Sequence, residues 1–457
     1  MNKSIQFPFG PDEVTIHIPQ SVDVLKMPVA ERLSNPETEI KQSLQHAIGT
    51  PGLDEIVRQK LASKPDATAV IVISDHTRPV PYRGSQGILW PIIELLLQCG
   101  VPQERILVLV APGTHRPLTD TELKTMLDER VFSAGIPIKS HNARDTAGLT
   151  HLGRTPAGSE VFVNSDYLNS DIKILTGLVE THFIAGFSGG RKSVCPGLIG
   201  EETTFLFHSA EYLSAPGSRD LNLVENPLHE EAVQVARIAG VDFIVNVTLN
   251  RSFDVTGVFS GDLEQAHLAA TELLRRYVEI RSERKYDIVI THAGFVGINH
   301  YQSVKAGLAA MGALRKGGWL IAVAANTDVD PIGTQRYQSL LHLMKMIGPE
   351  QFVKLIFSPD WTFVPDQWEV QAWSNLLMHV PPDRFVYYSP QMNAAQYAII
   401  PGIDGNRFLP AADRYQNSNK HIQAVIDGVL ELATAELGDS ARIAFLADGP
   451  YGIVARQ

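Results

Sequence analysis

The sequence has few cysteines and no long apolar run. Only two cysteines, Cys99 and Cys195, occur in 457 residues, which is too few for a disulfide framework, and they are too far apart for a C-x-x-C metal pair. The first residues alternate as in a strand and lack the apolar block of a signal peptide, and no apolar run reaches the length that spans a bilayer. We therefore expect a cytoplasmic protein with no membrane partner.

The sequence also lacks an excess of basic over acidic residues. The formal net charge is -11, whereas a nucleic-acid binder normally has the opposite sign or at least a basic stripe. Hydrophobic residues make up 44% and charged residues 19%, a globular balance that excludes general disorder. A chain of 457 residues is too long for one ordinary core, so two domains are expected.

Short β-branched runs alternate with amphipathic stretches along the chain. Strands are predicted at residues 67–74, 105–111, 171–177, 242–249, 286–292, 319–324 and 351–357, and helices at 87–99, 201–213, 226–239, 262–277 and 419–437. This order predicts an α/β fold of two domains, each with a largely parallel or mixed sheet flanked by helices, and an active site in the cleft between them. The polar stretch 281–285 marks the boundary, so the first domain is predicted to contain residues 1–279 with about 405–457, and the second 280–404.

Four polar clusters follow predicted strands, at the position where α/β sheets bind ligands. They are residues 74–79 (SDHTRP), 112–116 (PGTHR), 180–193 (ETHFIAGFSGGRKS) and 299–305 (NHYQSVK). Because all four have the expected topological position, they indicate a single shared site.

Taken singly, most of these clusters allow two interpretations. Residues 75–78 suit a turn cap as well as an anion site in which the arginine grips a carboxylate or phosphate. His115 is equally consistent with an ordinary histidine and an acid/base group, whereas His208, among apolar neighbours, is by default a core histidine. Tyr301 and Lys305, one helical turn apart, suit a binding face or a merely exposed one.

The segment 186–193 (GFSGGRKS) is the most unusual. It resembles the phosphate-binding P-loop, but Arg191 occupies the place of the glycine that precedes the P-loop lysine. A glycine-rich loop ending in Arg-Lys-Ser still suits an anionic ligand. A nucleotide-binding phosphotransferase therefore stays as an alternative, although no clear strand ends in an aspartate that would hold magnesium.

In order along the chain, these motifs resemble the nickel-pincer lactate racemase family. The pattern is D-x-T-R-P, G-T-H-R, T-H-F-x-x-G-F-S-G-G-R-K-S-x-x-P-G, a following histidine and Y-Q-x-x-K, over at least residues 74–305. The resemblance implies an isomerase, a racemase or epimerase of a 2-hydroxy acid, that passes a hydride to and from its cofactor through a 2-keto acid. The implied cofactor is nickel held by a pyridinium-3,5-bisthiocarboxylate mononucleotide, supplied by cofactor-biosynthesis enzymes. The first domain would bind it, and a Rossmann-like second domain would complete the substrate site.

The resemblance also implies a role for individual residues. Lys192 would carry the cofactor covalently, and His208 would be the protein ligand to nickel. His115 and His182 would be the acid/base pair. Four residues would lie against the cofactor: Asp75, His76, Thr77 and Arg78. Four would bind the substrate: Arg78, Tyr301, Gln302 and Lys305.

One stretch departs from the family pattern G-G-x-P-x-D-x-N-x-Y-Q. Residues 293–302 read AGFVGINHYQ, with Gly297 in the place of the aspartate. The substrate is therefore open between a lactate-like acid, a larger hydroxy acid and a sugar acid, and a homo-oligomer is left open too. Two further alternatives are a non-catalytic relative and a zinc hydrolase that would use His115, His182 and His208, whose spacing matches no standard zinc pattern.

Overall fold

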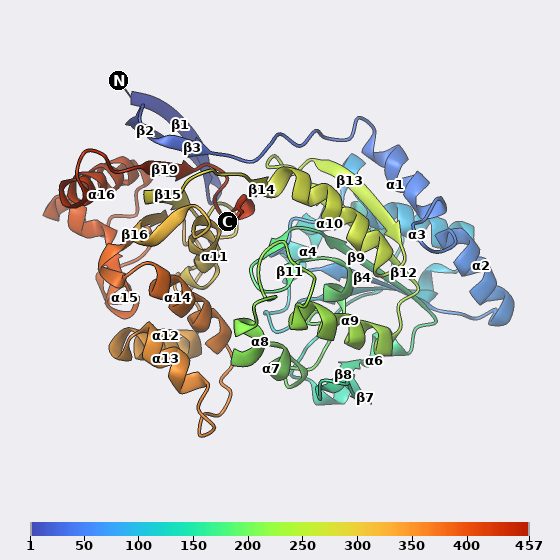
Figure 1. Cartoon of the computed structure of the whole chain (residues 1–457). Coiled ribbons are helices and arrows are strands. Elements are labelled where there is room, and N and C mark those ends of the chain that lie inside the picture. The colour runs from blue at the N-terminus through green and yellow to red at the C-terminus, as the bar shows by residue number, and fades with distance from the viewer. Residues whose placement is uncertain (1, 456–457) are drawn as a thin grey trace. The chain divides into compact units, whose positions relative to one another are not determined.

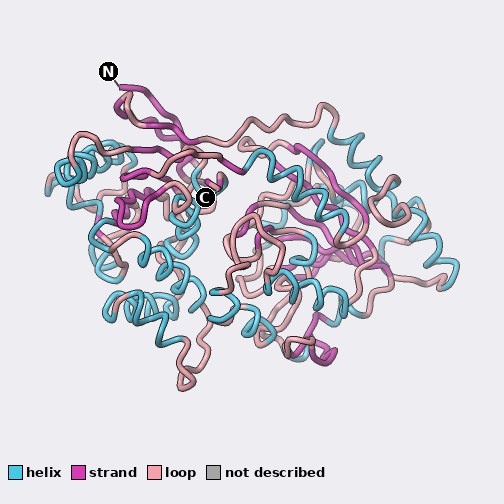
Figure 2. Tube along the Cα trace, in the orientation of Figure 1, coloured by secondary structure: helices cyan, strands magenta, loops and turns pink. Residues whose placement is uncertain are grey.

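The computed structural model describes residues 2–455, and these form two compact units. The central unit contains residues 29–276. The terminal unit joins the two ends of the chain, residues 2–28 with 277–455. Each unit contains a six-stranded sheet with helices around it, which confirms the predicted two-domain α/β class (Figures 1 and 2).

The sheet of the central unit has the strand order β13-β12-β9-β4-β5-β6. Neighbouring strands are parallel except β12 and β13, which are antiparallel. The strands are β4 (Ala69–Ser74), β5 (Ile106–Ala111), β6 (Ile138–Ser140), β9 (Ile172–Leu178), β12 (Phe243–Leu249) and β13 (Val255–Gly261). The longer helices are α1 (Pro36–Gln45), α2 (Leu53–Ser63), α3 (Leu89–Gln98), α9 (Pro227–Ala239) and α10 (Gln265–Val278).

The sheet of the terminal unit has the order β18-β17-β16-β15-β19-β3, and every neighbouring pair is parallel. Its strands are β3 (Asp23–Leu25), β15 (Tyr286–His292), β16 (Leu314–Val323), β17 (Phe385–Tyr388), β18 (Ile403–Asp404) and β19 (Ile443–Leu446). Its helices are α11 (His300–Ala310), α12 (Gln335–Ile347), α13 (Pro349–Ile356), α14 (Gln367–His379), α15 (Ala394–Ile399) and α16 (Ile422–Leu437). The hairpin of β1 (Asn2–Phe9) and β2 (Asp12–Pro19) packs apolar side chains into the same core.

The observed division of the chain differs from the predicted one. Residues 405–457 had been grouped with the first domain, but β19 pairs with β15 in the sheet of the terminal unit. The N-terminal β3 pairs with β19 in turn, so the start of the chain also belongs there. These short strands are stabilised by partners more than 150 residues away, and such long-range pairing leaves no local pattern in the sequence.

Two predicted elements also differ from the structure. Residues 351–357 had been predicted as a strand, but they belong mostly to α13, which begins at Pro349 and buries Phe352 and Ile356 at helical spacing. Residues 201–213 had been predicted as one helix, but the structure has α7 (Thr203–Phe207) and α8 (Ala210–Ser214). The hydroxyl of Ser209 caps α8, so a new helix starts directly after His208.

Within residues 2–455 we find no helix long and apolar enough to span a membrane.

Candidate active site

The first two polar clusters meet at one edge of the central sheet. Ser74 and Ala111 are paired at the ends of the parallel strands β4 and β5, so the residues that follow them emerge side by side. The backbone N–H and the hydroxyl of Thr77 donate to Asp75 Oδ1 at 3.2 and 2.6 Å. The other carboxylate oxygen, Oδ2, lies 2.7 Å from His115 Nδ1. Asp75 therefore both caps its turn and holds His115.

The electrostatics of this pair give His115 a defined orientation. Burial acts to raise the pKa of Asp75, but the hydrogen bond and charge of His115, with Thr77 and Arg78, outweigh it and lower the pKa to about 2. Because an ionised carboxylate can only accept, Nδ1–H of His115 is the donor. In the neutral form of the imidazole, Nε2 would then carry the lone pair, and the side chain is 45% exposed.

An ion pair connects the first cluster to the third. Arg78 Nη1 lies 3.0 Å from Glu180 Oε1, and both side chains are largely buried. Glu180 directly precedes the short strand β10 (Thr181–His182). The neighbouring His76 has a buried Nδ1 without a hydrogen-bond partner. The ion pair thus connects residues 75–78 to the segment that contains His182.

The glycine-rich segment has a defined shape that differs from a P-loop. After β11 (Gly186–Phe187), the chain turns through Gly189 and Gly190, which have φ values of 75° and 52°, into a single 3₁₀ turn. Arg191 is 1% exposed and donates to the carbonyl oxygens of Ala185 at 2.9 Å and Gly189 at 3.4 Å. No long helix follows whose N-terminus could hold a phosphate, which argues against the phosphotransferase alternative.

His182 and Lys192 are in direct contact across this segment. Nζ of Lys192 lies 3.1 Å from Nε2 of His182. The other ring nitrogen, Nδ1, accepts the backbone N–H of Ala185 at 3.3 Å. One predicted acid/base residue and the predicted cofactor-linked lysine are therefore neighbours.

His208 lies where α7 ends and α8 begins. Its Nδ1–H donates to the carbonyl oxygen of Thr204 at 3.0 Å, so Nε2 carries the lone pair. Burial, reinforced by the positive charge of Lys192, lowers the pKa of His208 to about 3. The imidazole is neutral at physiological pH, which is the form that binds metals, and it lies within the electrostatic reach of Lys192.

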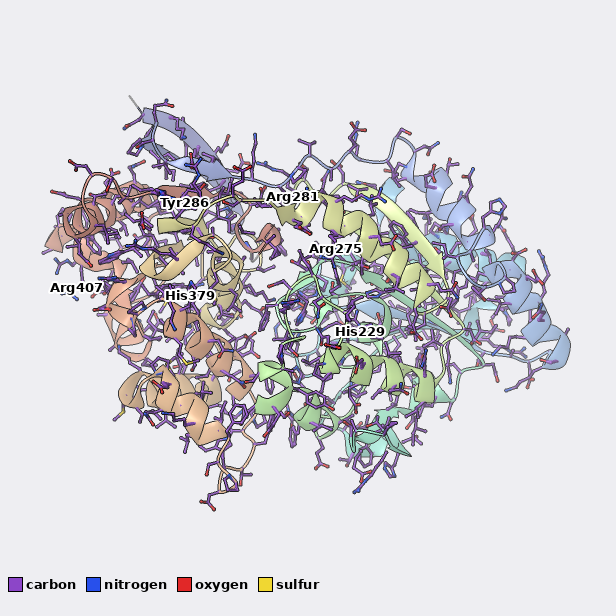
Figure 3. The ribbon with its side chains drawn as sticks, viewed as in Figure 1. His229, Arg275, Arg281, Tyr286, His379 and Arg407 are labelled. Carbon is purple, nitrogen blue, oxygen red and sulfur yellow. The ribbon has the colours of Figure 1, made fainter. Side chains whose placement is uncertain are left out.

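Two further histidines lie close to the glycine-rich segment, and burial lowers the pKa of both. His267, on α10, places Nε2 3.0 Å from Arg191 Nη1 and 2.8 Å from the carbonyl oxygen of Ser188. His229, on α9 (labelled in Figure 3), stacks near His267, with ring centroids 6.5 Å apart. Sequence analysis missed both histidines, because each lies on an amphipathic helix where nothing local distinguishes it.

The remaining predicted residues belong to the terminal unit, on α11. The side chain of Asn299 caps this helix by accepting the N–H of Gln302 at 3.0 Å. The hydroxyl of Tyr301 accepts a hydrogen bond of 2.7 Å from Trp368 Nε1. Burial raises the pKa of Glu369 to about 8, against the opposing charge of Lys305. Lys305 therefore interacts electrostatically with a buried carboxyl group on α14.

His300, which precedes Tyr301 on α11, is expected to make the stability of the fold sensitive to acid. His300 is fully buried, stacks on Trp373 with ring centroids 4.4 Å apart, and burial lowers its pKa to about 3. In the unfolded chain its pKa is about 6.5, so between these pH values the unfolded state binds more protons and stability falls as pH falls. At pH 5 the expected cost is about 2 kcal/mol. Urea denaturation at pH 7.5 and 5 should show a smaller pH-dependent loss in His300→Phe, and an equal loss would contradict this assignment.

A zinc site built from the three predicted histidines is not formed. Across residues 2–455, no group of three or more His, Cys, Asp or Glu side chains is arranged to hold a metal ion. His115 is held by Asp75 and His182 by Lys192, so each has a partner of its own.

The chain matches known proteins along most of its length. Residues 9–220 match the family described as the lactate racemase N-terminal domain, and residues 281–433 match the lactate racemase C-terminal domain. The chain is 31% identical over 427 residues to the lactate racemase of Lactiplantibacillus plantarum, covering 93% of this chain and 92% of that protein. It is 29% identical over 437 residues to the lactate racemase of Thermoanaerobacterium thermosaccharolyticum, covering 93% and 98%.

Two solved structures are similar to this fold. The lactate racemase apoprotein of Thermoanaerobacterium thermosaccharolyticum superposes with a TM-score of 0.82 at 25% identity and covers 99% of this chain and 100% of that one. A protein of Thermotoga maritima gives a TM-score of 0.60 at 16% identity, covering 89% and 99%, which shows likeness of fold alone.

Proposed function

Because the chain belongs to the lactate racemase family, we propose that it racemises or epimerises a 2-hydroxy acid with the help of a nickel-bearing nucleotide cofactor. It is an isomerase, and its substrate is a small molecule. The observation that carries the proposal is the pair of differently held imidazoles in the central unit. Asp75 orients His115, and the backbone of Ala185 orients His182 beside Lys192.

Two histidines suit inversion at a carbon that bears a hydroxyl group. The Cα hydrogen of a hydroxy acid is poorly acidic, so it is removed more easily as a hydride while a base takes the hydroxyl proton. The product is a planar 2-keto acid, which can be reduced from either face. A proton donor and acceptor is then needed on each side, and imidazole serves both directions because its ordinary pKa of about 6.5 is near working pH. In this proposal Nε2 of His115 takes or returns the hydroxyl proton on one face, and His182 does so on the other.

The donor groups of the central unit fit the implied cofactor. His208 offers a neutral Nε2 to a metal, and Lys192, whose charge acts on His208, offers an amine for covalent attachment. The buried Nδ1 of His76 without a hydrogen-bond partner would face a bound group. When bound, the nickel-pincer nucleotide would supply the hydride acceptor and donor, while the protein supplies orientation. Residues 75–78 would lie against it.

The cations of the site would hold the substrate carboxylate while the carbonyl group reorients. In the central unit, Arg78 presents a guanidinium next to Glu180. In the terminal unit, the proposed substrate-binding residues lie on α11: Tyr301, Gln302 and Lys305. Gly297 stands where the family pattern has an aspartate. A Cβ added at Gly297 would come within 2.2 Å of Ala293 Cβ, so this position has no room for an aspartate side chain. We therefore propose lactate-like, larger and sugar-derived 2-hydroxy acids as the candidate substrates.

We also propose that the protein works in the cytoplasm and that the enzymes that make the cofactor are its partners. The free thiols of Cys99 and Cys195 suit the reducing cytosol.

A substrate panel tests the function. We expect the chain, produced together with the cofactor-making enzymes, to convert one enantiomer or epimer of a 2-hydroxy acid into a mixture of both, as read by chiral chromatography. Short, aromatic and polyhydroxylated acids should be compared, with chain produced alone as the matched control. Binding of a hydroxy acid without inversion of any member of the panel would favour the non-catalytic relative instead.

A further inference from the structure

The strand order of the central sheet reverses between β4 and β9. From β4 the chain continues to β5 and β6 on one side of the sheet, and then to β9 and β12 on the other. Open α/β sheets bind their ligands at such a reversal, beyond the carboxyl ends of the strands. Pairing of β4 with β9 ends at Val72, whereas pairing of β4 with β5 continues to Ser74. The segments that follow β4 and β9 therefore lie on the two sides of this reversal.

A buried tyrosine connects the ends of these two strands. The backbone N–H of Ser74 donates to the hydroxyl oxygen of Tyr82 at 2.7 Å. The hydroxyl of Thr176 donates to the carbonyl oxygen of Val72 at 2.7 Å, so Tyr82 is the donor in its 2.9 Å contact with Thr176. Because Tyr82 is 1% exposed and Thr176 is 0% exposed, this chain of hydrogen bonds fixes the end of β4 against β9.

An ion pair joins the segments that follow the two strands. Arg78, after β4, has its Nη1 3.0 Å from Oε1 of Glu180, after β9, and the two side chains are 22% and 19% exposed. Ser188 fixes the backbone of Glu180 on both sides: its hydroxyl accepts the N–H at 3.0 Å, and its own N–H donates to the carbonyl oxygen at 2.9 Å. The guanidinium of Arg78 is therefore paired with a carboxylate whose own position is fixed.

This pairing leaves one edge of the guanidinium open. Arginine has five N–H donors, and the edge formed by Nε and Nη2 matches the two oxygens of a carboxylate. Among residues 2–455, Nε and Nη2 of Arg78 have no acceptor. A further carboxylate would meet a cation whose charge is already offset by Glu180 and by the nearby carboxylate of Asp75. Such a ligand would bind weakly and in one orientation.

We propose that Glu180 is a positioning residue that directs the open edge of Arg78 and offsets its charge, so that the carboxylate of a 2-hydroxy acid is held in one orientation at moderate affinity. The proposal rests on the proposed function for the identity of this ligand. During inversion the keto group turns while the carboxylate stays in place, so the carboxylate needs a fixed partner. Glu180 acts through Arg78 and does not itself touch the substrate.

Binding of propionate tests the electrostatic part without turnover, because propionate has a carboxylate but no hydroxyl group to oxidise. The chain is produced with the cofactor-making enzymes, and the affinity is measured by titration calorimetry at pH 7. Glu180→Gln removes a negative charge beside Arg78 and keeps the shape, so it should bind propionate at least about threefold more tightly. Arg78→Gln removes the cation and should bind propionate at least about tenfold more weakly.

Turnover tests the positioning part. In Glu180→Gln we expect kcat from each enantiomer or epimer to fall at least about tenfold, with no rise in KM. A damaged fold would weaken propionate binding as well, so tighter binding with slower turnover identifies the positioning role. Glu180→Asp keeps the charge but shortens the side chain, so its propionate affinity should stay within a factor of about two while kcat still falls.

Glu160→Gln is the matched control. Glu160 pairs with Arg154 on the hairpin of β7 (Leu149–Arg154) and β8 (Glu160–Asn164), and its side chain is 37% exposed. Propionate affinity and kcat should both stay within a factor of about two of the wild type, because exposed ion pairs contribute little.

Three results would overturn the proposal: unchanged or weaker propionate binding in Glu180→Gln, unchanged kcat in that variant, or unchanged propionate binding in Arg78→Gln. The proposed function fails separately. If the wild type inverts no hydroxy acid while propionate binding changes as expected in both variants, the proposed function would be overturned and the control of Arg78 by Glu180 would stand.

Discussion

Lys192→Ala is expected to abolish inversion of the hydroxy acid, with a loss of at least roughly a thousandfold in kcat. The chain's own side chains offer proton transfer and charge but no group that accepts a hydride, so the reaction depends on a cofactor that Lys192 would hold. The amine of Lys192 is in contact with His182 and acts electrostatically on His208, so its loss would remove the one covalent anchor in this group. Chiral chromatography of the reaction mixture gives the measurement.

Lys139→Ala is the matched control for this variant. Lys139 is an exposed lysine of the same unit, 2.7 Å from Asp166, and its removal should leave kcat within a factor of about two, because surface ion pairs contribute little. Retention of most of the activity in Lys192→Ala, under conditions where Lys139→Ala is also active, would show that the cofactor is not anchored at Lys192.

His115→Ala and His182→Ala are each expected to lower kcat by about 10²–10⁴-fold, the usual contribution of a positioned acid or base. Racemisation needs proton transfer on both faces of the substrate, so removing either imidazole should slow both directions of the interconversion. Steady-state rates measured from each enantiomer provide the test. KM should change much less than kcat, because neither histidine is proposed to bind the carboxylate.

Asp75→Asn separates the chemistry of His115 from its orientation. The amide can still cap the turn of Thr77, but its neutral oxygen is a weaker partner for His115 Nδ1–H than the carboxylate that lies 2.7 Å away. An intermediate loss of kcat is therefore expected, smaller than that of His115→Ala. If His115→Ala were as active as the wild type while His182→Ala was inactive, the two-histidine arrangement would be wrong.

The parts of the site that follow strands were predictable from the sequence. The runs that form β4, β5 and β9 are apolar and β-branched, and the topology of a parallel sheet brings the residues after them to one edge. The glycine-rich segment with Lys192 was also conspicuous, because three glycines and two cations follow within eight residues. The local sequence pattern was therefore enough to propose most of the candidate residues of the central unit.

The contacts that orient these residues could not be predicted in the same way. Arg78 meets Glu180, and Arg191 meets His267, across 102 and 76 residues of chain, so no short window contains both partners. The position of His208 depends on Ser209 starting a new helix, a capping event that a continuous helical pattern conceals. The same long-range dependence explains the wrong assignment of residues 405–457.

The central claim is that Lys192 and His208 hold one nickel-bearing cofactor in the central unit. The most direct measurement is the nickel content of chain produced with the cofactor-making enzymes, combined with the mass of the peptide that contains Lys192. The account predicts close to one nickel per loaded chain and a cofactor-sized mass addition on Lys192. Active protein that contains no nickel and carries an unmodified Lys192 would contradict it.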